Sequence, residues 1–277
     1  MVSLQVRNDL NVSVSLSSEI KSISQSPSTN SVVIFSDTPS FHSAISWIKS
    51  PKDGIILEPG KTIPYPLSVR VPTAAEPGGW SAAALVSPKP LIATSEGAIQ
   101  VQEKIATVLL FSVPGEVVVQ ERIKSFTTDK SWYMNLPVKF SLDYLNNGTV
   151  HTTPMTMITI RNWRGKIVSE IPVNQELRTV LPKNERVFIA SWRMPFANDA
   201  FGLIKTLLVI PPAWGKMTAS VTVGPSVDSQ TATLTFWLIP IVPIVIALFI
   251  IFILLLWYRR ALMRLRQSAP AEKDSER

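Results

Sequence analysis

Cysteine is absent from this chain of 277 residues. Disulfide bonds, cysteine-ligated metal sites and thiol nucleophiles are therefore excluded, and stability must come from buried apolar cores. Histidine is scarce: His42 and His151 are its two occurrences, and neither lies in an HExxH motif or beside a recognisable triad partner. The sequence predicts a protein that is not an enzyme and that has no metal site, no catalytic residue and no cofactor.

Acidic residues are fewer than basic ones, 20 against 27, which gives a formal net charge of +7. Residues 259–277 hold six of the basic side chains and three of the acidic ones. No comparable cluster of Lys and Arg occurs earlier in the chain. Nucleic acid is therefore not an expected partner, in spite of the basic pI.

One apolar run without any charge extends from Phe236 to Tyr258. As a helix it would be about 34 Å long, enough for a hydrocarbon core of about 30 Å. Its expected membrane anchors are the aromatic residues at its two ends, because such rings favour the headgroup layers. They are Phe236, Trp237, Trp257 and Tyr258. We predict a transmembrane helix over 236–258; the alternative is a central helix of a soluble core.

Four arginines follow the run directly, namely Arg259, Arg260, Arg264 and Arg266. Because Lys and Arg near a span stay on the cytoplasmic side, we expect residues 259–277 to be a short cytoplasmic tail and everything before 236 to be extracellular. The segment after Met1 lacks the basic start and apolar core of a signal peptide. We therefore expect the natural reading frame to begin further upstream.

Alternation of apolar and polar residues dominates the external portion, as at 63–71, 138–144 and 188–194. Period two predicts strands that bury one face, and Gly, Pro and Asn turns separate them. We expect an all-β protein with two tandem immunoglobulin-like β-sandwich domains, at 1–115 and 116–225. Residues 226–235 would be a short polar stalk or a last strand that leads into the bilayer. Pro64 and Pro66 lack amide donors, which favours an edge position for their strand.

A motif in the first domain reads LEPG at 57–60 and VPTAAEPGGW at 71–80, and Trp47-Ile48 precedes it. It resembles the signature of the peptidoglycan-binding, immunoglobulin-like domain of the WxL-interacting protein family, the DUF916-like proteins, with Trp80 in place of the more common Tyr. The matching residues are Trp47, Pro59, Gly60, Pro72, Pro77, Gly78, Gly79 and Trp80.

The resemblance covers residues 10–115 well and the rest loosely. It implies a bacterial cell-surface protein that binds the cell wall, with peptidoglycan as the first ligand. The family's first strand is not found before Val2, which implies that the first domain lacks it.

Tryptophans are the candidate contact residues. We expect Trp47 and Trp80 to fill the core, as buried aromatic rings usually do. Trp132, Trp163 and Trp214 lie near expected loops, and they are the candidates for stacking on a glycan ring.

Four functions are compatible with this pattern. The favoured one is a membrane-anchored surface protein that binds peptidoglycan or a surface protein partner. A non-catalytic scaffold or spacer of a membrane complex is the second. Glycan cleavage by loop carboxylates such as Asp129 or Asp199 is the third, and signalling through the short tail is the fourth.

Overall fold

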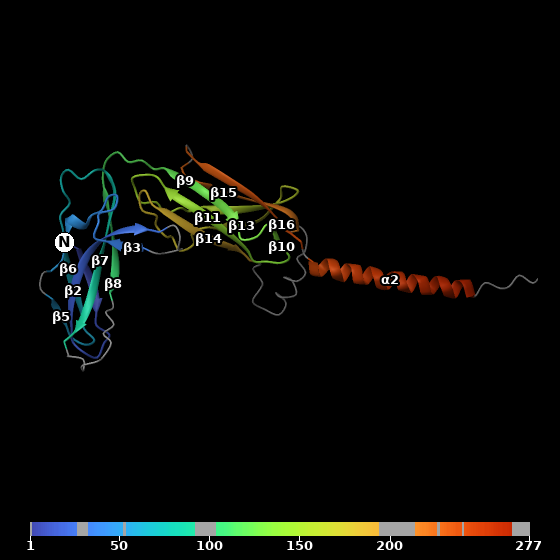
Figure 1. Cartoon of the computed structure of the whole chain (residues 1–277), viewed down its shortest axis with the longest axis horizontal. Coiled ribbons are helices and arrows are strands. Elements are labelled where there is room, and N and C mark those ends of the chain that lie inside the picture. The colour runs from blue at the N-terminus through green and yellow to red at the C-terminus, as the bar shows by residue number, and fades with distance from the viewer. Residues whose placement is uncertain are drawn as a thin grey trace, which may run out of the picture.

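The structure is a computed structural model, and it describes residues 2–26, 33–51, 54–91, 104–193, 214–225, 228–239 and 241–267. Within these ranges the chain forms two β-sandwiches, followed by one long helix at the C-terminal side. The first sandwich stands at an angle to the second, and the helix α2 leaves from the far end of the second (Figure 1). The predicted all-β class with one C-terminal helix is confirmed.

The first sandwich is built from the first eight strands, and a short 3-10 helix, Ile45–Trp47, precedes β4. One sheet has the order β1-β6-β4, and the other has the order β3-β2-β7-β8, with β5 also paired to β2. The strands are β1 (Val2–Arg7), β2 (Val14–Gln25), β3 (Val33–Ser36), β4 (Ile48–Lys49), β5 (Ile55–Leu57), β6 (Thr62–Val69), β7 (Gly78–Pro90) and β8 (Ile105–Val113).

Alternation explains the first core. In β6 the side chains of Tyr65 and Leu67 are fully buried, and in β2 those of Val14 and Leu16 are nearly so. These residues meet Trp47 and the small residues of β7 in one hydrophobic cluster. Each sheet therefore contributes one apolar face, which is the packing that defines a sandwich.

The second sandwich contains the remaining eight strands. Its larger sheet has the order β10-β16-β15-β12-β13, and its smaller sheet has the order β14-β11-β9. The strands are β9 (Glu121–Thr128), β10 (Trp132–Tyr133), β11 (Val138–Asn146), β12 (Met157–Asn162), β13 (Ile167–Pro172), β14 (Glu185–Trp192), β15 (Gly215–Val223) and β16 (Gln230–Leu238). The division of the chain at residue 115 stays a prediction, although β8 ends at Val113 and β9 begins at Glu121.

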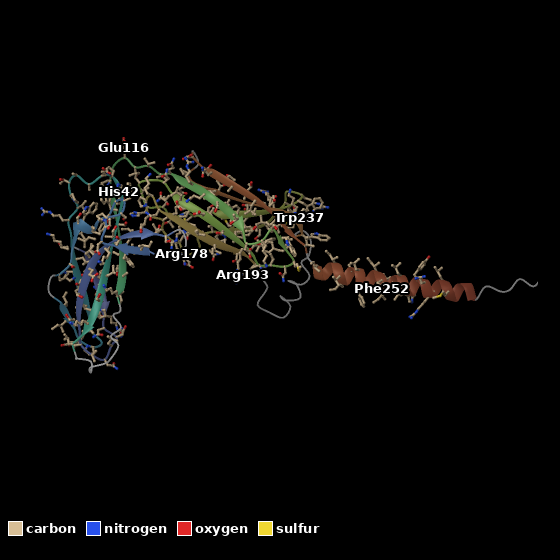
Figure 2. All side chains as sticks on the ribbon, in the orientation of Figure 1. His42, Glu116, Arg178, Arg193, Trp237 and Phe252 are labelled. Carbon is tan, nitrogen blue, oxygen red and sulfur yellow. The ribbon has the colours of Figure 1, made fainter. Side chains whose placement is uncertain are left out.

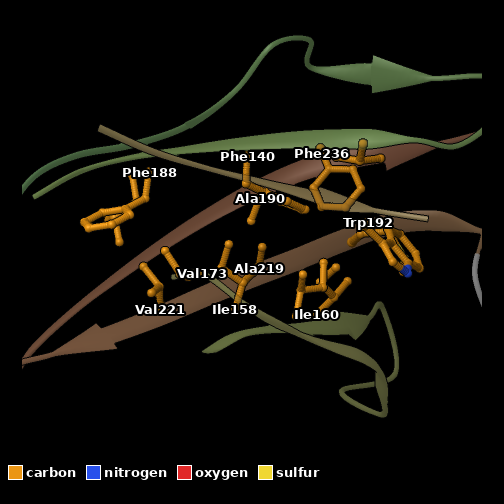
Figure 3. Close-up of a cluster of buried hydrophobic side chains, with 14 of the residues drawn as sticks. Phe140, Ile158, Ile160, Val173, Phe188, Ala190, Trp192, Ala219, Val221 and Phe236 are labelled. Atoms are coloured by element: carbon orange, nitrogen blue, oxygen red, sulfur yellow. The ribbon is translucent and has the colours of Figure 1, made fainter. Parts of the chain in front are cut away.

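Phe236 is in the core of the second sandwich, with no exposed surface. Its ring makes edge contacts with the rings of Tyr133, Phe140 and Trp192, at centroid distances of 5.8, 5.8 and 6.4 Å. Figure 3 shows Phe236 with Phe140 and Trp192. The strand β16 that carries it pairs with β15 over its whole length. The expected anchor role of Phe236 is therefore wrong. Of the two possibilities expected for 226–235, a stalk or a last strand, the structure shows a strand from Gln230, which continues to Leu238.

The helix α2 (Ile241–Gln267) begins five positions later than the predicted 236 and ends beyond the predicted 258. Its segment Ile244–Met263 has a mean hydropathy of 2.2, and none of it is buried against the described part of the chain. Twenty residues make about 30 Å of helix, so α2 is long and apolar enough to cross a membrane. The predicted anchors Trp257 and Tyr258 are exposed on it, and Arg259, Arg260, Arg264 and Arg266 lie within its last turns.

The edge position expected for Pro64 and Pro66 is only half correct. Their strand β6 is the middle strand of its sheet. β1 pairs with it from Thr62 to Leu67, whereas β4 pairs only with Ser68 and Val69. Among the described residues, β6 thus has a partner strand on one side only beside the two prolines, and the missing amide donors are tolerated.

The position of Phe236 can be tested by truncation. We expect Phe236→Ala to lower the free energy of unfolding of the second sandwich by about 3–5 kcal/mol, because a buried ring is replaced by a cavity. Chemical denaturation of the full chain in detergent micelles, followed by tryptophan fluorescence, measures this. Leu254→Ala on α2 is the matched control and should leave that transition unchanged. Equal behaviour of the two variants would contradict the position assigned to Phe236.

Candidate functional site

Trp47 and Trp80, from the motif of the first domain, pack against each other. Their ring centroids are 4.4 Å apart, and Trp47 is almost fully buried. The indole N–H of Trp80 donates a hydrogen bond to the backbone carbonyl of Glu76 at 3.0 Å. Trp47 thus has a packing role in the core, and the half-buried ring of Trp80 packs against it.

The prolines and glycines of the motif shape turns. Gly60 has a φ of 69° and closes the turn between β5 and β6, where its N–H donates to the carbonyl of Asn8. Pro72 and Pro77 flank the loop that leads into β7, and Pro77 lies against Gly115, in the segment that connects the two sandwiches. The motif therefore ends where the sandwiches meet.

Gly78 and Gly79 bring the two sandwiches into direct backbone contact. The N–H of Gly79 donates to the carbonyl of Thr149 in the second sandwich at 2.8 Å. A Cβ atom on Gly78 would lie 2.5 Å from that carbonyl oxygen, and one on Gly79 would lie 2.6 Å from Nδ1 of His151. Because neither position has room for a side chain, the glycine pair permits the contact.

Both histidines of the chain are at this junction. Nδ1 of His42 lies 3.2 Å from the carbonyl of Gly79, and the His42 ring stacks between Phe41 and Trp80. His151 lies against Gly79 from the other sandwich, and its Nε2 is buried with no hydrogen-bond partner among the described residues. Burial lowers the pKa of His151, and the nearby His42 lowers it further. No sequence motif linked the two histidines, because they are brought together by domain packing alone.

A second contact zone holds the sandwiches together. Gln25, at the end of β2, donates through its side-chain nitrogen to the carbonyl of Thr179 and accepts from the N–H of Leu181, at 2.9 and 3.0 Å. Leu181 also packs with Ile23, Ala83 and Leu85 in a small buried cluster. This cluster covers the face of β7 that points away from the first core. The junction thus combines buried apolar surface with satisfied hydrogen bonds.

Strand β8 is the edge strand of its sheet and lies beside this cluster. We use the term β8 edge for the unpaired side of β8 together with the exposed side chains of Val108 and Leu110. In the described part of the chain β8 pairs with β7 alone. Val108 and Leu110 lie opposite Ala83 and Ser81 of β7 and are 44% and 45% exposed. They extend the apolar surface of the buried cluster to the margin of the sheet. An unpaired strand with exposed apolar side chains is a site for another chain to add.

The carboxylate Asp129 lines a hollow of about 800 Å³ beside Trp132. It accepts a hydrogen bond from the Tyr133 hydroxyl, which lowers the pKa of Asp129. Burial, with this bond, raises the pKa of Tyr133 to about 12. Asp129 is the one carboxylate among the described residues that line the hollow, whereas glycoside cleavage uses a pair. Asp199, the other carboxylate named above, lies outside the described residues.

Trp132, Trp163 and Trp214 are exposed, and they gather at the end of the second sandwich from which α2 leaves. Trp132 pairs with Trp237 across β10 and β16. Trp214 directly precedes β15, and Trp163 lies 3.4 Å from the Cβ position of the adjacent Gly215. Trp237 completes this group. Sequence reasoning treated Trp237 as part of the helix and so did not connect it with the other three.

No protein-family model matches the chain, and no curated protein matches it. The resemblance to the WxL-interacting proteins thus stays a prediction. Among solved structures the chain is similar to the YadV chaperone, with 10% identity, coverage of 84% of this chain and 91% of that chain, and a TM-score of 0.38.

Two further structures give similar values. The CupB2 chaperone of Pseudomonas aeruginosa has 10% identity, coverage of 86% and 92%, and a TM-score of 0.37. A chain of the CsuC-CsuE chaperone-tip adhesion subunit complex from the Csu pili of Acinetobacter baumannii has 10% identity, coverage of 84% and 89%, and a TM-score of 0.37. At these values the similarity carries no inference about function.

The junction should be sensitive to acid through His151. Its pKa is lowered in the folded chain, so below the unfolded value of about 6.5 the unfolded chain binds the extra proton first. We expect the contribution of His151 to the free energy of unfolding to be constant above that pH, to fall as the pH drops from there to the folded pKa, and to level off below it. Denaturation of the full chain at a series of pH values measures this. In His151→Gln the plot of unfolding free energy against pH should be flatter. Identical plots for the two chains would refute the role of His151 in the acid sensitivity.

Proposed function

We propose that this chain is a bacterial membrane-anchored cell-surface protein whose two immunoglobulin-like sandwich domains lie outside the cell and bind a protein partner without catalysis. The observation that carries the proposal is the β8 edge. In the described part of the chain, this apolar strand beside the domain junction has no partner strand on one side.

The helix α2 supports the anchor. Its apolar surface has no described part of the chain packed on it, so water would meet nearly all of it unless a bilayer covers it. The aromatic residues Trp257 and Tyr258 lie near its C-terminal end, where such rings favour a headgroup layer. Arg259 and Arg260 follow at once and support a cytoplasmic C-terminus.

Strand addition supports the choice of a protein partner. A strand laid along β8 would satisfy its free backbone groups, and its own alternate side chains could pack on Val108 and Leu110. Ala83 and Leu85, on the same side of β7, are buried under Leu181, so the β8 edge borders an apolar cluster that the second sandwich already covers. A partner bound there would meet a surface held at a fixed angle by the junction.

Peptidoglycan remains the ligand that the motif resemblance implies. Of the motif tryptophans, Trp47 is buried, and the half-buried ring of Trp80 is stacked on His42 and packed on Trp47, which leaves little ring surface for a sugar. The passive scaffold is the remaining alternative, and it would leave the β8 edge without a partner.

The β8 edge can be tested by charge insertion. We expect Leu110→Lys to weaken partner binding roughly tenfold or more, because the side chain contributes about 1.5–3 kcal/mol when buried. A photoreactive residue at position 108 of the full chain, in its native membrane, measures the yield of the cross-linked partner. Ile189→Lys is the matched control, since Ile189 is also an exposed apolar residue of an edge strand.

The same variants separate the alternatives. Equal cross-linking yields in Leu110→Lys and in the unaltered chain would contradict the β8 edge as the site. Co-sedimentation with purified wall sacculi that survives Leu110→Lys would favour wall binding. Absence of any cross-linked partner above the Ile189 background would favour the passive scaffold.

The orientation has its own test. A protease added to spheroplasts should digest the sandwiches and leave a small membrane-bound fragment that contains α2, because the chain before the helix is outside. A tag placed after Arg277 should stay protected until the membrane is permeabilised. Protection of the sandwiches with digestion of the tag would invert the topology.

A further inference from the structure

The end of the second sandwich nearest α2 differs in chemistry from the rest of that domain. We define the α2 end as residues 129–139, 161–167, 214–218 and 235–239. Four tryptophans lie on it, and each is between 43% and 61% exposed. They are half of the eight tryptophans of the chain. Exposed tryptophan is costly in water, so a cluster of four indicates a surface that contacts something else.

The four side chains come together through strand register. Trp132 lies beside Trp237, and Trp237 lies beside Lys216 of β15, so the three form a row across neighbouring strands. Trp163 and Trp214 border this row at the β12–β13 turn and at the start of β15. Figure 2 shows Trp237 at the end of the sandwich where α2 begins.

The same sheet face changes character along its strands. Moving away from α2, the outward residues of β16 after Trp237 are Thr235, Thr233 and Thr231. Those of β15 after Lys216 are Thr218, Ser220 and Thr222. On these two strands the aromatic and basic residues, Trp237 and Lys216, thus lie next to the strand end nearest α2, whereas the other outward residues are Thr and Ser. This gradient runs along the direction in which α2 departs (Figure 1).

Charged residues also differ between the two ends of the second sandwich. The α2 end contains six basic residues and one acidic residue, Asp129, which is hydrogen-bonded to Tyr133. Arg164 lies over the Trp163 ring at 4.4 Å, a cation–π contact. In the described part of the chain, Arg161, Arg164, Lys166 and Lys216 form no ion pair. The opposite end has the ion pairs Arg122–Asp228 and Lys124–Glu185. Unpaired cations at the α2 end are available to an anionic surface.

The connection to α2 places this end at the bilayer. The N–H of Ile239 donates to the carbonyl of Tyr133 at 2.8 Å, so the chain stays attached to the sheet up to that residue. The helix begins two positions later, at Ile241, and two residues reach at most about 7 Å. If α2 crosses the membrane, the α2 end must therefore lie at the headgroup layer.

We propose that the α2 end is a membrane-docking surface, in which Trp132, Trp163, Trp214 and Trp237 enter the headgroup layer and the surrounding Lys and Arg side chains bind anionic lipid headgroups. Tryptophan rings favour that layer, and Lys and Arg side chains gain free energy beside anionic lipid headgroups. The inference rests on the proposed spanning role of α2. The second sandwich is then seated on the membrane instead of swinging freely above it.

The absence of cysteine permits a clean test, because one introduced thiol carries the only label. Thr235→Cys and Thr231→Cys are a matched pair, since both positions are exposed and face outward on β16, about 13 Å apart. The full chain is labelled with a fluorophore and reconstituted into phosphatidylcholine vesicles with phosphatidylglycerol and a nitroxide-headgroup lipid. We expect stronger quenching at 235 than at 231, and a larger difference with more phosphatidylglycerol.

Two variants identify the cause. Replacing the four tryptophans with Ser should remove the difference between the labels. Lys216→Glu keeps every tryptophan and should lower the ratio of docked to undocked chain at least about fivefold, since one cation near the surface is worth about that factor. Lys89→Glu, on an exposed strand position of the first sandwich, is the control and should change nothing.

Each failure has a distinct signature. Extraction of the chain from the vesicles by alkali would refute the spanning helix itself. Retention of the chain with equal quenching at both labels would overturn the docking surface alone. Retention with equal quenching, together with a tryptophan fluorescence change on addition of soluble glycan fragments, would assign the α2 end to glycan.

Discussion

The burial of Phe236 is the constraint on which the relation between the domains and the helix depends. Because its ring is enclosed by Tyr133, Phe140 and Trp192, the whole of β16 is held in the sheet. The backbone remains hydrogen-bonded to β10 up to Ile239, and α2 starts at Ile241. A flexible stalk would let the sandwich take any orientation above a bilayer. Here the connection is too short for that, so the surface chemistry of one end of the domain becomes relevant to the membrane.

Strand positions were largely predictable, because alternation alone places Tyr65 and Leu67 of β6, or Phe140 and Leu142 of β11, on a buried face. The end of β16 was not. Phe236, Trp237 and Leu238 are apolar, as is the helix that follows, and a run of apolar residues has no period that separates a strand from a span. A signal did exist upstream: polar and apolar residues alternate from Thr231 to Phe236, and this alternation continues the strand into the run.

The junction shows a second limit of sequence reasoning. His42 and His151 meet because two loops pack together, and no local pattern encodes a contact over that separation. Gly78 and Gly79 were recognised as turn residues of a motif, but their tight fit against Thr149 and His151 depends on the partner domain. For the candidate surfaces the situation is similar. Trp132, Trp163 and Trp214 were identified as exposed aromatic residues, whereas their proximity to Trp237 follows from strand register.

The α2 end lies at one end of the second sandwich, and the β8 edge belongs to the first sandwich, which packs against the other end. This separation has a physical consequence. A nine-residue strand such as β16 spans about 30 Å, which is roughly three to four Debye lengths at physiological ionic strength. The negative potential of the headgroups therefore decays before it reaches the junction and the β8 edge. Docking of the α2 end would fix the orientation of the second sandwich and its height above the bilayer. The β8 edge would remain available to a partner. A partner with a free strand would then meet the β8 edge at a defined distance from the bilayer, because the buried Leu181 cluster and the Gly79–Thr149 bond hold the first sandwich in place.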